Sequence, residues 1–298
     1  MLEAVERIIE RFIADLDDAD AQMLLRRLPS GKRLRARLIL EIAGSRLQTR
    51  KLAAVVEMIH AASLLHDDVL DEADVRRGRP SINAAFDDKT AIMFGDVLYS
   101  KAFYELVEID RAVARVVSEA VVRLSLGERR DILLAQRFNP DREAYIEMID
   151  LKTAALIQAA AESAALLAGK TPALYRTYGR NLGIAFQMID DLLDITQDAA
   201  TLGKPSLHDF AEGKTTLPYI DLYHALEPEE RTVLVGMHGR PLRSGEAEWI
   251  QERMARHGIV QQCADQARAL IDEAIVLMRD AGESSLEQIA RAMIERSF

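Results

Sequence analysis

Two short clusters of aspartates stand out because each follows a segment of apolar residues. They are Asp67-Asp68-Val69-Leu70-Asp71 and Asp190-Asp191-Leu192-Leu193-Asp194. On a helix the first and last aspartates of such a cluster project from one face, about one turn apart. Carboxylates next to buried segments repel one another and resist desolvation unless cations neutralise them. The pattern therefore predicts sites for a divalent cation, and ligands that are all oxygen favour Mg²⁺ over zinc.

Basic residues accompany both clusters. Arg76-Arg77 follows the first cluster, and Gly31-Lys32-Arg33-Leu34-Arg35 precedes it at an expected helix start, where backbone N–H groups favour an anion. The other candidate cations are Lys152, beside Thr153 in a long helical segment, and Lys204 and Lys214, beyond the second cluster. The chain as a whole is acidic, with 38 basic and 48 acidic residues. Cations gathered beside carboxylates in an acidic chain predict a site for phosphates, some bound through Mg²⁺ and some directly.

His60 is a further candidate for a phosphate contact. It precedes Asp67 by seven residues, or two helical turns, so the two side chains share one side of a helix. A single histidine in an apolar helix is more often a hydrogen-bonded core residue, but this position relative to the first cluster favours a contact with bound phosphate. His66 faces another direction, and we assign it no role.

Helices must position these residues, because apolar residues recur at steps of three and four and do not alternate. Helical segments are expected, within a few residues at each end, at 2–16, 33–47, 52–70, 90–108, 111–135, 142–168, 174–196, 217–226, 246–256, 260–280 and 285–296. No strand of useful length and no repeat of fixed period is found. The pattern predicts a single all-α domain over residues 1–298. The polar stretch near 200–215 fits a functional loop or a domain boundary equally well.

Composition excludes several classes of protein. Hydrophobic residues make up 49% of the chain, so a disordered chain is excluded, and no run of about 18 uninterrupted apolar residues predicts a membrane span. The net charge of -10 argues against a nucleic-acid partner. The first residues lack the pattern of a signal peptide, and the single cysteine, Cys263, cannot form an internal disulfide. Together these features predict a cytoplasmic protein.

Five blocks, in the expected order, resemble the trans-type polyprenyl diphosphate synthases. The blocks are GKRLR at 31–35, HAASLLHDDVLDEADVRRGRPSIN at 60–83, LKT at 151–153, FQMIDDLLD at 186–194 and LGKPSLHDFAEGKTTLP at 202–218. The resemblance covers residues from about 25 to about 225. It implies the all-α isoprenoid synthase fold, a single large helical bundle with a central active-site cavity, and a homodimer. It also implies a Mg²⁺-dependent prenyltransferase that joins an allylic diphosphate, such as farnesyl diphosphate, to isopentenyl diphosphate.

The resemblance further implies a role for each matching residue. Three Mg²⁺ ions would bind the allylic diphosphate, and their ligands and supporting carboxylates would be Asp67, Asp71 and Asp190, with Asp68 and Asp194. That diphosphate would also contact Arg76, Lys152, Thr153, Gln187, Lys204 and Lys214. Isopentenyl diphosphate would bind without metal to Lys32, Arg35, His60 and Arg77. The catalytic residues, which stabilise the departing diphosphate, would be Asp67, Asp71, Asp190, Lys152 and Arg76. No protein base is assigned.

The residues just before the first cluster bear on product length. Ala62 and Ser63 lie about one turn deeper than Asp67 on the ligand side. In the family, bulky aromatic side chains at these positions resemble a floor that stops growth at short products, although small residues here also permit close helix packing. Small side chains predict a medium or long product, hexaprenyl to octaprenyl. A deeper floor would come from Tyr99, Phe103 or Leu106, which share a helix face.

Four alternatives are weighed against this interpretation. A short-chain synthase making farnesyl or geranylgeranyl diphosphate shares the same blocks. A non-catalytic subunit of a heteromeric synthase would be expected to lose carboxylates, yet both clusters are intact. A terpene cyclase would not need GKRLR and Arg77, and a di-iron protein would need a second copy of the Glu57-x-x-His60 motif. Two positions depart from the family pattern. Ala36 in place of proline would alter a helix turn but removes no phosphate contact, and Asp87-Asp88 in place of Gly-Asn stays without interpretation.

Overall fold

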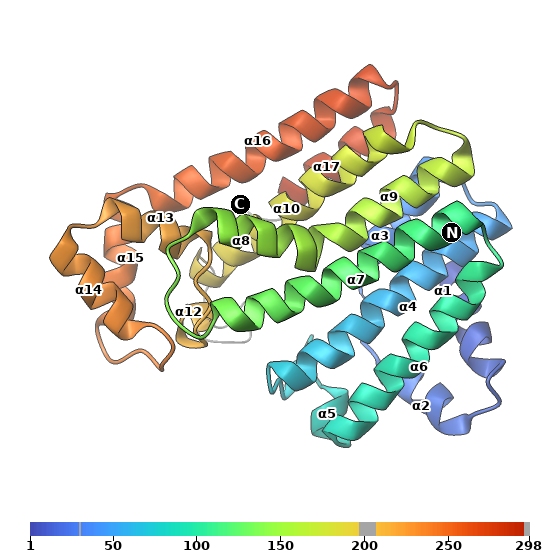
Figure 1. The fold of residues 1–298 in the computed structure, drawn as a ribbon, viewed down its shortest axis with the longest axis horizontal. Coiled ribbons are helices and arrows are strands. Elements are labelled where there is room, and N and C mark those ends of the chain that lie inside the picture. The colour runs from blue at the N-terminus through green and yellow to red at the C-terminus, as the bar shows by residue number, and fades with distance from the viewer. Residues whose placement is uncertain (30, 197–206, 295–298) are drawn as a thin grey trace. The chain divides into compact units, whose positions relative to one another are not determined.

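The computed structural model describes residues 1–29, 31–196 and 207–294, and most of these residues lie in helices (Figure 1). The all-α class predicted from the sequence is therefore confirmed. The chain divides into two compact units, Met1–Val121 with Leu156–Arg176, and Val122–Ala155 with Thr177–Phe298. The division does not fall near 200–215, the stretch that the sequence left open as a boundary, of which 207–215 are described.

The first unit is built around one apolar helix, α4 (Leu47–Leu70). The other helices of this unit are α1 (Leu2–Ala14), α2 (Ala19–Arg27), α3 (Leu34–Ala43), α5 (Ile82–Ala85), α6 (Asp88–Val107), the first part of α7 (Arg111–Leu134) and most of α9 (Ala155–Ala168). Helices α4 and α6 lie side by side, and α1 and α3 also pack on α4 (Figure 1). Every residue from Leu52 to Ile59 is buried, because this helix is apolar on nearly all sides.

Arg33 ties three helices of the first unit together. Its guanidinium donates hydrogen bonds to both carboxylate oxygens of Glu6 in α1, at 2.6 and 2.9 Å, and to Glu57 in α4, at 3.2 Å. The buried Glu57 carboxylate also accepts a hydrogen bond of 2.9 Å from the backbone N–H of Ala36 in α3. A proline at position 36 has no N–H to donate, so alanine here provides a contact that the usual family residue cannot.

A short hairpin follows the first aspartate cluster. Strands β1 (Val75–Arg76) and β2 (Arg79–Pro80) pair antiparallel, with Arg76 opposite Arg79. The two turn residues, Arg77 and Gly78, both have positive φ, +52° and +72°, as a two-residue hairpin turn requires. A non-glycine residue in this left-handed region costs about 1–2 kcal/mol. The turn thus holds Arg77 in a fixed, strained conformation close to Asp67 and Asp71 in sequence.

Asp87 caps the next helix of this unit. Its side chain accepts a hydrogen bond of 2.7 Å from the backbone N–H of Thr90 in the first turn of α6. This contact lowers the pKa of the Asp87 carboxyl, and an aspartate at an N-cap stabilises the start of a helix. The Asp87-Asp88 departure therefore has a structural explanation.

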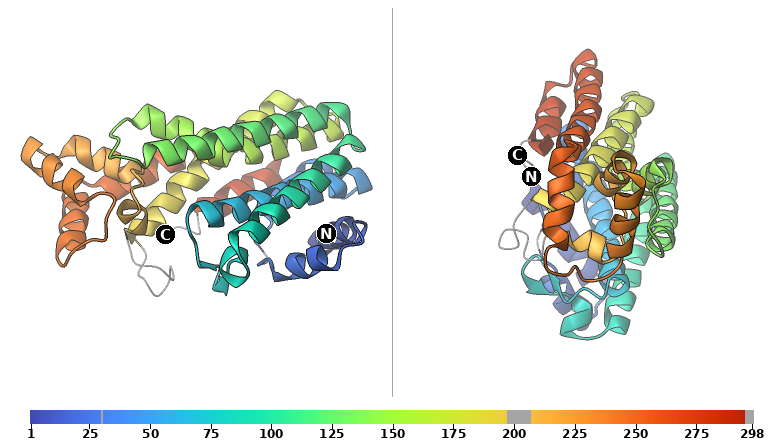
Figure 2. Two further views of the ribbon diagram at one scale, coloured as in Figure 1. Left: turned by 60° about the horizontal axis from the view of Figure 1, so that its bottom comes forward. Right: turned by 90° about the vertical axis from the view of Figure 1, so that its left-hand side faces the viewer.

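The second unit contains the remaining elements. They are the rest of α7 from Val122 on, α8 (Arg142–Ile149), the π-helical turn η1 (Asp150–Ala154), most of α10 (Pro172–Thr196), α12 (His208–Ala211), α13 (Leu217–Ala225), α14 (Pro228–Met237), α15 (Glu246–Arg256), α16 (Ile259–Asp280) and α17 (Ser284–Ile294). Helix α17 packs on α16, which is visible at the orange-to-red end of the chain in Figure 2. The Tyr178 hydroxyl of α10 donates a hydrogen bond of 2.7 Å to the backbone carbonyl of Leu286, which fixes α17 to α10.

Two glycines of the second unit approach the backbone of η1. A Cβ placed on Gly127 of α7 would lie 2.7 Å from Lys152 Cα, and one on Gly183 of α10 would lie 2.5 Å from Ala154 Cα. Both distances are shorter than carbon atoms tolerate, so only glycine permits these approaches. A π-helical turn is rare and is frequent at functional sites. Here it carries Lys152 and Thr153, two of the predicted substrate contacts.

One helix in the described part of the chain, Arg142–Ala168, is long and apolar enough to cross a membrane by length and composition alone. Within the protein, 67% of its most apolar window is buried. A core helix passes the same test, so this helix by itself does not indicate a membrane protein.

Candidate active site

The first aspartate cluster ends helix α4. The backbone N–H of Asp71, the C-cap residue, donates a hydrogen bond of 2.8 Å to the carbonyl of Asp67. Asp67 is half-buried and Asp71 is exposed, so their side chains lie one helical turn apart where solvent reaches them. Two accessible carboxylates at this spacing suit Mg²⁺, which keeps several ligands from water or phosphate. Within 1–29, 31–196 and 207–294, no group of three His, Cys, Asp or Glu forms a ready-made metal cage.

Asp68 differs from its neighbours because it is buried and holds Arg76. Its Oδ1 accepts a hydrogen bond of 2.5 Å from Arg76 Nε. Burial raises the pKa of the Asp68 carboxyl, although Arg76 pulls it down. The Asn83 side chain donates to the backbone carbonyl of Asp68 at 3.3 Å, which ties the end of α4 to the segment after the hairpin. Asp68 therefore holds the guanidinium of Arg76 in place.

Four arginines act on His60. Burial holds the pKa of His60 well below its ordinary value, and the charges of Arg35, Arg77, Arg76 and Arg33 lower that pKa further. The imidazole is therefore neutral at pH 7. A neutral imidazole can donate one hydrogen bond to an anion without adding to the repulsion among the arginines.

Two of these arginines are crowded together by the loop before α3. A Cβ on Gly31 would lie 2.6 Å from Arg77 Nη1, so glycine lets that guanidinium rest on the loop backbone. Burial lowers the pKa of both Arg35 and Arg77, and Arg77 lowers that of Arg35 further. The Nε of Arg35 is buried without a hydrogen-bond partner in the described part of the protein. Such a group costs free energy unless a ligand pairs with it. Lys32, in the same loop, is exposed.

The residues that bear on product length lie inside the first unit. Ala62 is fully buried and Ser63 is 5% exposed, and the Ser63 hydroxyl donates a hydrogen bond of 2.9 Å to the carbonyl of His60. His66 faces α6, where its Nε2 lies 3.1 Å from the carbonyl oxygen of Ile92 and its ring lies over Gly95. His66 therefore packs against α6, in agreement with the expectation that it faces away from the first aspartate cluster.

An aromatic stack lines the face of α6 that was predicted to hold the floor. The ring of His66 lies 5.7 Å from that of Tyr99, and Tyr99 stacks on Phe103 at 6.4 Å between ring centroids. Tyr99 and Phe103 are half-buried, whereas Leu106 is 1% exposed.

The second aspartate cluster lies in α10 and is split between core and surface. Asp190 is exposed, whereas Asp191 and Asp194 are each 3% exposed. Asp191 accepts hydrogen bonds from the Tyr145 hydroxyl and, at 2.9 Å, from Gln187 Nε2. Burial, and then the nearby Asp209 carboxylate, raise the pKa of Asp191 well above its ordinary value. Asp191 and Tyr145 were not among the predicted site residues.

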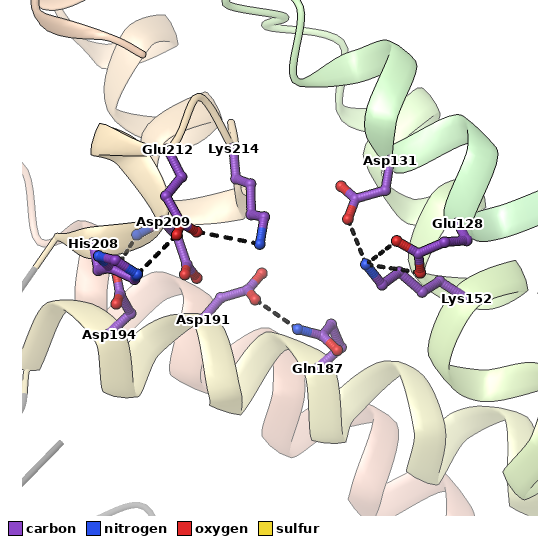
Figure 3. Close-up of polar contacts among 10 residues, drawn as sticks. All are labelled: Glu128, Asp131, Lys152, Gln187, Asp191, Asp194, His208, Asp209, Glu212 and Lys214. Atoms are coloured by element: carbon purple, nitrogen blue, oxygen red, sulfur yellow. Dashed lines mark hydrogen bonds and ion pairs between the residues drawn. The ribbon is translucent and has the colours of Figure 1, made fainter. Parts of the chain in front are cut away.

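Gln187 links the π-helical turn to this cluster. Its Oε1 accepts a hydrogen bond of 2.8 Å from the Thr153 hydroxyl. Its Nε2 donates to Asp191, the contact drawn in Figure 3. The structure therefore brings together Thr153 and Gln187, two predicted substrate contacts, and fixes the orientation of the glutamine amide.

The segment that starts at Leu207 contacts Asp194. Backbone N–H groups of Leu207 and Asp209 donate to the Asp194 carbonyl and to its Oδ2, at 2.9 and 3.2 Å. Lys214 Nζ lies 3.3 Å from the Glu212 carboxylate, and Figure 3 shows both of these side chains above Asp191. The predicted contact Lys204 lies outside the described residues.

Lys152 lies between two acidic side chains that the sequence analysis did not select. Its Nζ is 2.6 Å from Asp131 Oδ2 and 3.0 Å from Glu128 (Figure 3). Both carboxylates follow Gly127 on α7, the glycine that approaches η1. Glu128 and Asp131 are three residues apart, a spacing that is visible in the sequence. Only the structure shows that both of them contact Lys152.

Comparison with known proteins gives the class of this fold and site. The polyprenyl synthetase family matches residues 21–254, which is most of the chain. The chain therefore belongs to this family, and it is a prenyltransferase with the isoprenoid synthase fold. The family, fold and enzyme class predicted from the five sequence blocks are confirmed.

Individual relatives match between about three quarters of the chain and nearly all of it. A short chain isoprenyl diphosphate synthase from Methanothermobacter thermautotrophicus is 32% identical and covers 96% of this chain and 94% of its own length. Octaprenyl diphosphate synthase from Escherichia coli is 39% identical over 76% of this chain and 72% of its own. Among solved structures, octaprenyl pyrophosphate synthase from Helicobacter pylori is 39% identical, with a TM-score of 0.93 over 98% of both chains.

One solved relative was crystallised with ligands. A polyprenyl synthase from Caulobacter crescentus, 30% identical with a TM-score of 0.86 over 99% of this chain and 96% of its own, is complexed with calcium and isoprenyl diphosphate. A divalent cation agrees with the carboxylate oxygens that both units of the present chain offer.

Proposed function

We propose that the protein condenses an allylic diphosphate repeatedly with isopentenyl diphosphate to give a medium- or long-chain all-trans polyprenyl diphosphate. The observation that carries this proposal is the cluster of arginines around the neutral His60. Among the residues that the structure describes, the buried Nε of Arg35 has no hydrogen-bond partner, so the cluster favours an anionic ligand. A diphosphate supplies several oxygens to such a cluster, and Arg pairs well with phosphate.

Isopentenyl diphosphate would bind in the first unit without metal. Arg35, Arg77 and the exposed Lys32 would neutralise its charge, and His60 would donate a hydrogen bond. The fixed hairpin turn and the glycine beneath Arg77 support this assignment, because they pre-organise one guanidinium before the ligand arrives.

The allylic diphosphate would bind at the two aspartate clusters. Asp67, Asp71 and Asp190 would hold three Mg²⁺ ions, with Asp68 and Asp194 as supporting carboxylates. When bound, Mg²⁺ neutralises the diphosphate oxygens on which negative charge grows as the allylic C–O bond breaks. Further contacts would come from Arg76, Lys152, Thr153, Gln187, Lys204 and Lys214. Asp68 holds Arg76 by a hydrogen bond, and Thr153 and Asp191 hold Gln187 in the same way. Both side chains are therefore oriented before the reaction.

The product length follows from the residues before Asp67. Ala62 and Ser63 are buried and small, so neither places a bulky side chain at the positions where an aromatic one would stop growth. The similarity to octaprenyl synthases supports a product of six to eight isoprene units, while the short-chain relative keeps farnesyl or geranylgeranyl diphosphate as the second candidate. We further propose a cytoplasmic homodimer, each chain forming one functional domain over 1–298, with no nucleic-acid partner and no membrane span.

Replacement of the metal-binding carboxylates tests the proposal. Asp67→Ala and Asp190→Ala should each lower kcat by at least about a hundredfold, because each removes a ligand needed mainly in the transition state. Asp272→Ala, which removes an exposed carboxylate of α16, is the control and should keep normal turnover. Normal turnover in either cluster variant would refute the metal assignment.

A further inference from the structure

Lys152 is paired with more negative charge than it carries. Its Nζ lies 3.0 Å from both carboxylate oxygens of Glu128 and 2.6 Å from Asp131 Oδ2. The three side chains are only 23%, 12% and 14% exposed, so water screens them weakly. One carboxylate is enough to neutralise an ammonium group. The second carboxylate is therefore not needed for charge balance, and it fixes the position of the ammonium group.

The backbone around Lys152 is built for this contact. Gly127 lets α7 approach η1 so closely that a Cβ would lie 2.7 Å from Lys152 Cα. Glu128 is the next residue and Asp131 lies three further on, so both project from one face of α7 toward the lysine. Figure 3 shows the lysine side chain reaching along η1 to both carboxylates. Glycine, the π-helical turn and the acidic pair thus act together on one side chain.

A lysine whose ammonium group is held in one position loses less conformational freedom on binding a ligand than a mobile lysine does. Lysine has a flexible four-carbon stem, and its ammonium group carries three N–H donors. Two carboxylates restrict the stem to one arrangement, so the ammonium group lies in a defined place before a phosphate arrives. Order imposed before the ligand binds lowers the entropy that is lost on binding.

We propose that Glu128 and Asp131 are positioning residues that hold Lys152 for the departing diphosphate of the allylic substrate. This inference rests on the proposed contact between Lys152 and that diphosphate. The two carboxylates do not touch substrate. They act through the lysine, so their removal has no effect once the lysine is absent.

A double-mutant cycle tests the inference with the full-length protein. The variants are Asp131→Asn, Asp131→Glu, Lys152→Met and the double variant Lys152→Met with Asp131→Asn. Glu147→Gln is the matched control, since Glu147 pairs with Arg130 of the same helix α7 but is 60% exposed. For each variant we would measure kcat and KM for farnesyl diphosphate and for isopentenyl diphosphate in a single condensation with Mg²⁺, together with Tm.

Asp131→Asn should lower kcat/KM for farnesyl diphosphate by about tenfold, with KM for isopentenyl diphosphate within about twofold of wild type. Asp131→Glu should recover most of the loss, because the charge is restored, and Glu147→Gln should match wild type. In the Lys152→Met background, Asp131→Asn should cause no further loss.

Equal losses from Asp131→Asn with and without Lys152 would overturn the positioning role, as would a fall in Tm with unchanged kinetic constants. An active Lys152→Met variant with normal constants for farnesyl diphosphate would instead refute the contact of Lys152 in the proposed function. A wild-type protein without prenyl transfer would refute the proposed function itself.

Discussion

Gly127→Ala is the substitution that most directly perturbs the backbone beneath Lys152. The added Cβ would lie 2.7 Å from both Lys152 Cα and the carbonyl carbon of Leu151. The backbone N of Lys152 lies closer still, and ordinary van der Waals contact begins at 3.4 Å, so α7 and η1 must move apart by more than about 0.7 Å. Neither neighbour is the flexible end of a side chain, so the backbones themselves must move.

The effects on stability and on activity should differ in size. Alanine gains about 1 kcal/mol over glycine in helix propensity, whereas overpacking costs about 1–3 kcal/mol, so the net loss of stability should be about 0–2 kcal/mol. Catalysis is more sensitive, because misplacing a group by about 1 Å can cost up to about a hundredfold in rate. We therefore expect kcat to fall at least about tenfold in a protein that is still folded.

Gly236→Ala is the matched control. Gly236 is exposed in α14, and a Cβ there would meet nothing within 4 Å, so alanine should raise stability by about 0.5–1 kcal/mol without changing activity. Urea unfolding and steady-state kinetics on both variants make the comparison. Full activity of Gly127→Ala would refute the argument that this approach positions Lys152.

Three further predictions concern the first unit. Arg35→Ala should raise KM for isopentenyl diphosphate more than for the allylic substrate, and Arg76→Ala should do the reverse; equal effects in steady-state kinetics would disprove two separate sites. Because the folded-state pKa of His60 lies well below 6.5, its contribution to stability is complete above pH 6.5 and is lost as pH falls. Wild type should therefore lose up to about 1.4 kcal/mol per pH unit relative to His60→Gln between pH 6.5 and 5.5, and parallel urea midpoints would contradict this. Ser63→Phe should shorten the product to farnesyl or geranylgeranyl length while sparing the first condensation, and unchanged products on chromatography would remove Ser63 from length control.

The long helices could be predicted from sequence because their apolar residues keep one period over many turns. Helices α4 and α10 are two such cases. Helices α2 and α14 were missed because they are short, nine and ten residues, and carry few buried side chains. The hairpin strands have two residues each, too few to show alternation.

The π-helical turn could not be predicted, since its apolar pattern is continuous with that of α8 and α9. It is visible only in the structure, where Gly127 and Gly183 meet its backbone. Both glycines could be read as weak points of a helix from sequence alone. Only the distance to the neighbouring backbone shows why glycine is required there.

The candidate site was predictable where one helix carries it. The spacing of Asp67 and Asp71, and that of Asp190 and Asp194, predicted that each pair shares a helix face. The sequence pattern does not show which face of α10 is buried. The buried Asp191 and its partner Tyr145 were therefore missed. Contacts between helices, such as Lys152 with Glu128, depend on packing, so the spacing of the acidic residues alone does not identify their partner.

The product of the wild-type protein tests the central claim most directly. Purified protein would be incubated with farnesyl diphosphate, isopentenyl diphosphate and Mg²⁺, and the hydrolysed products would be analysed by mass spectrometry. The account predicts all-trans polyprenols from hexaprenol to octaprenol, and no product when Mg²⁺ is chelated. Products no longer than geranylgeraniol, or condensation that continues without a divalent cation, would contradict it.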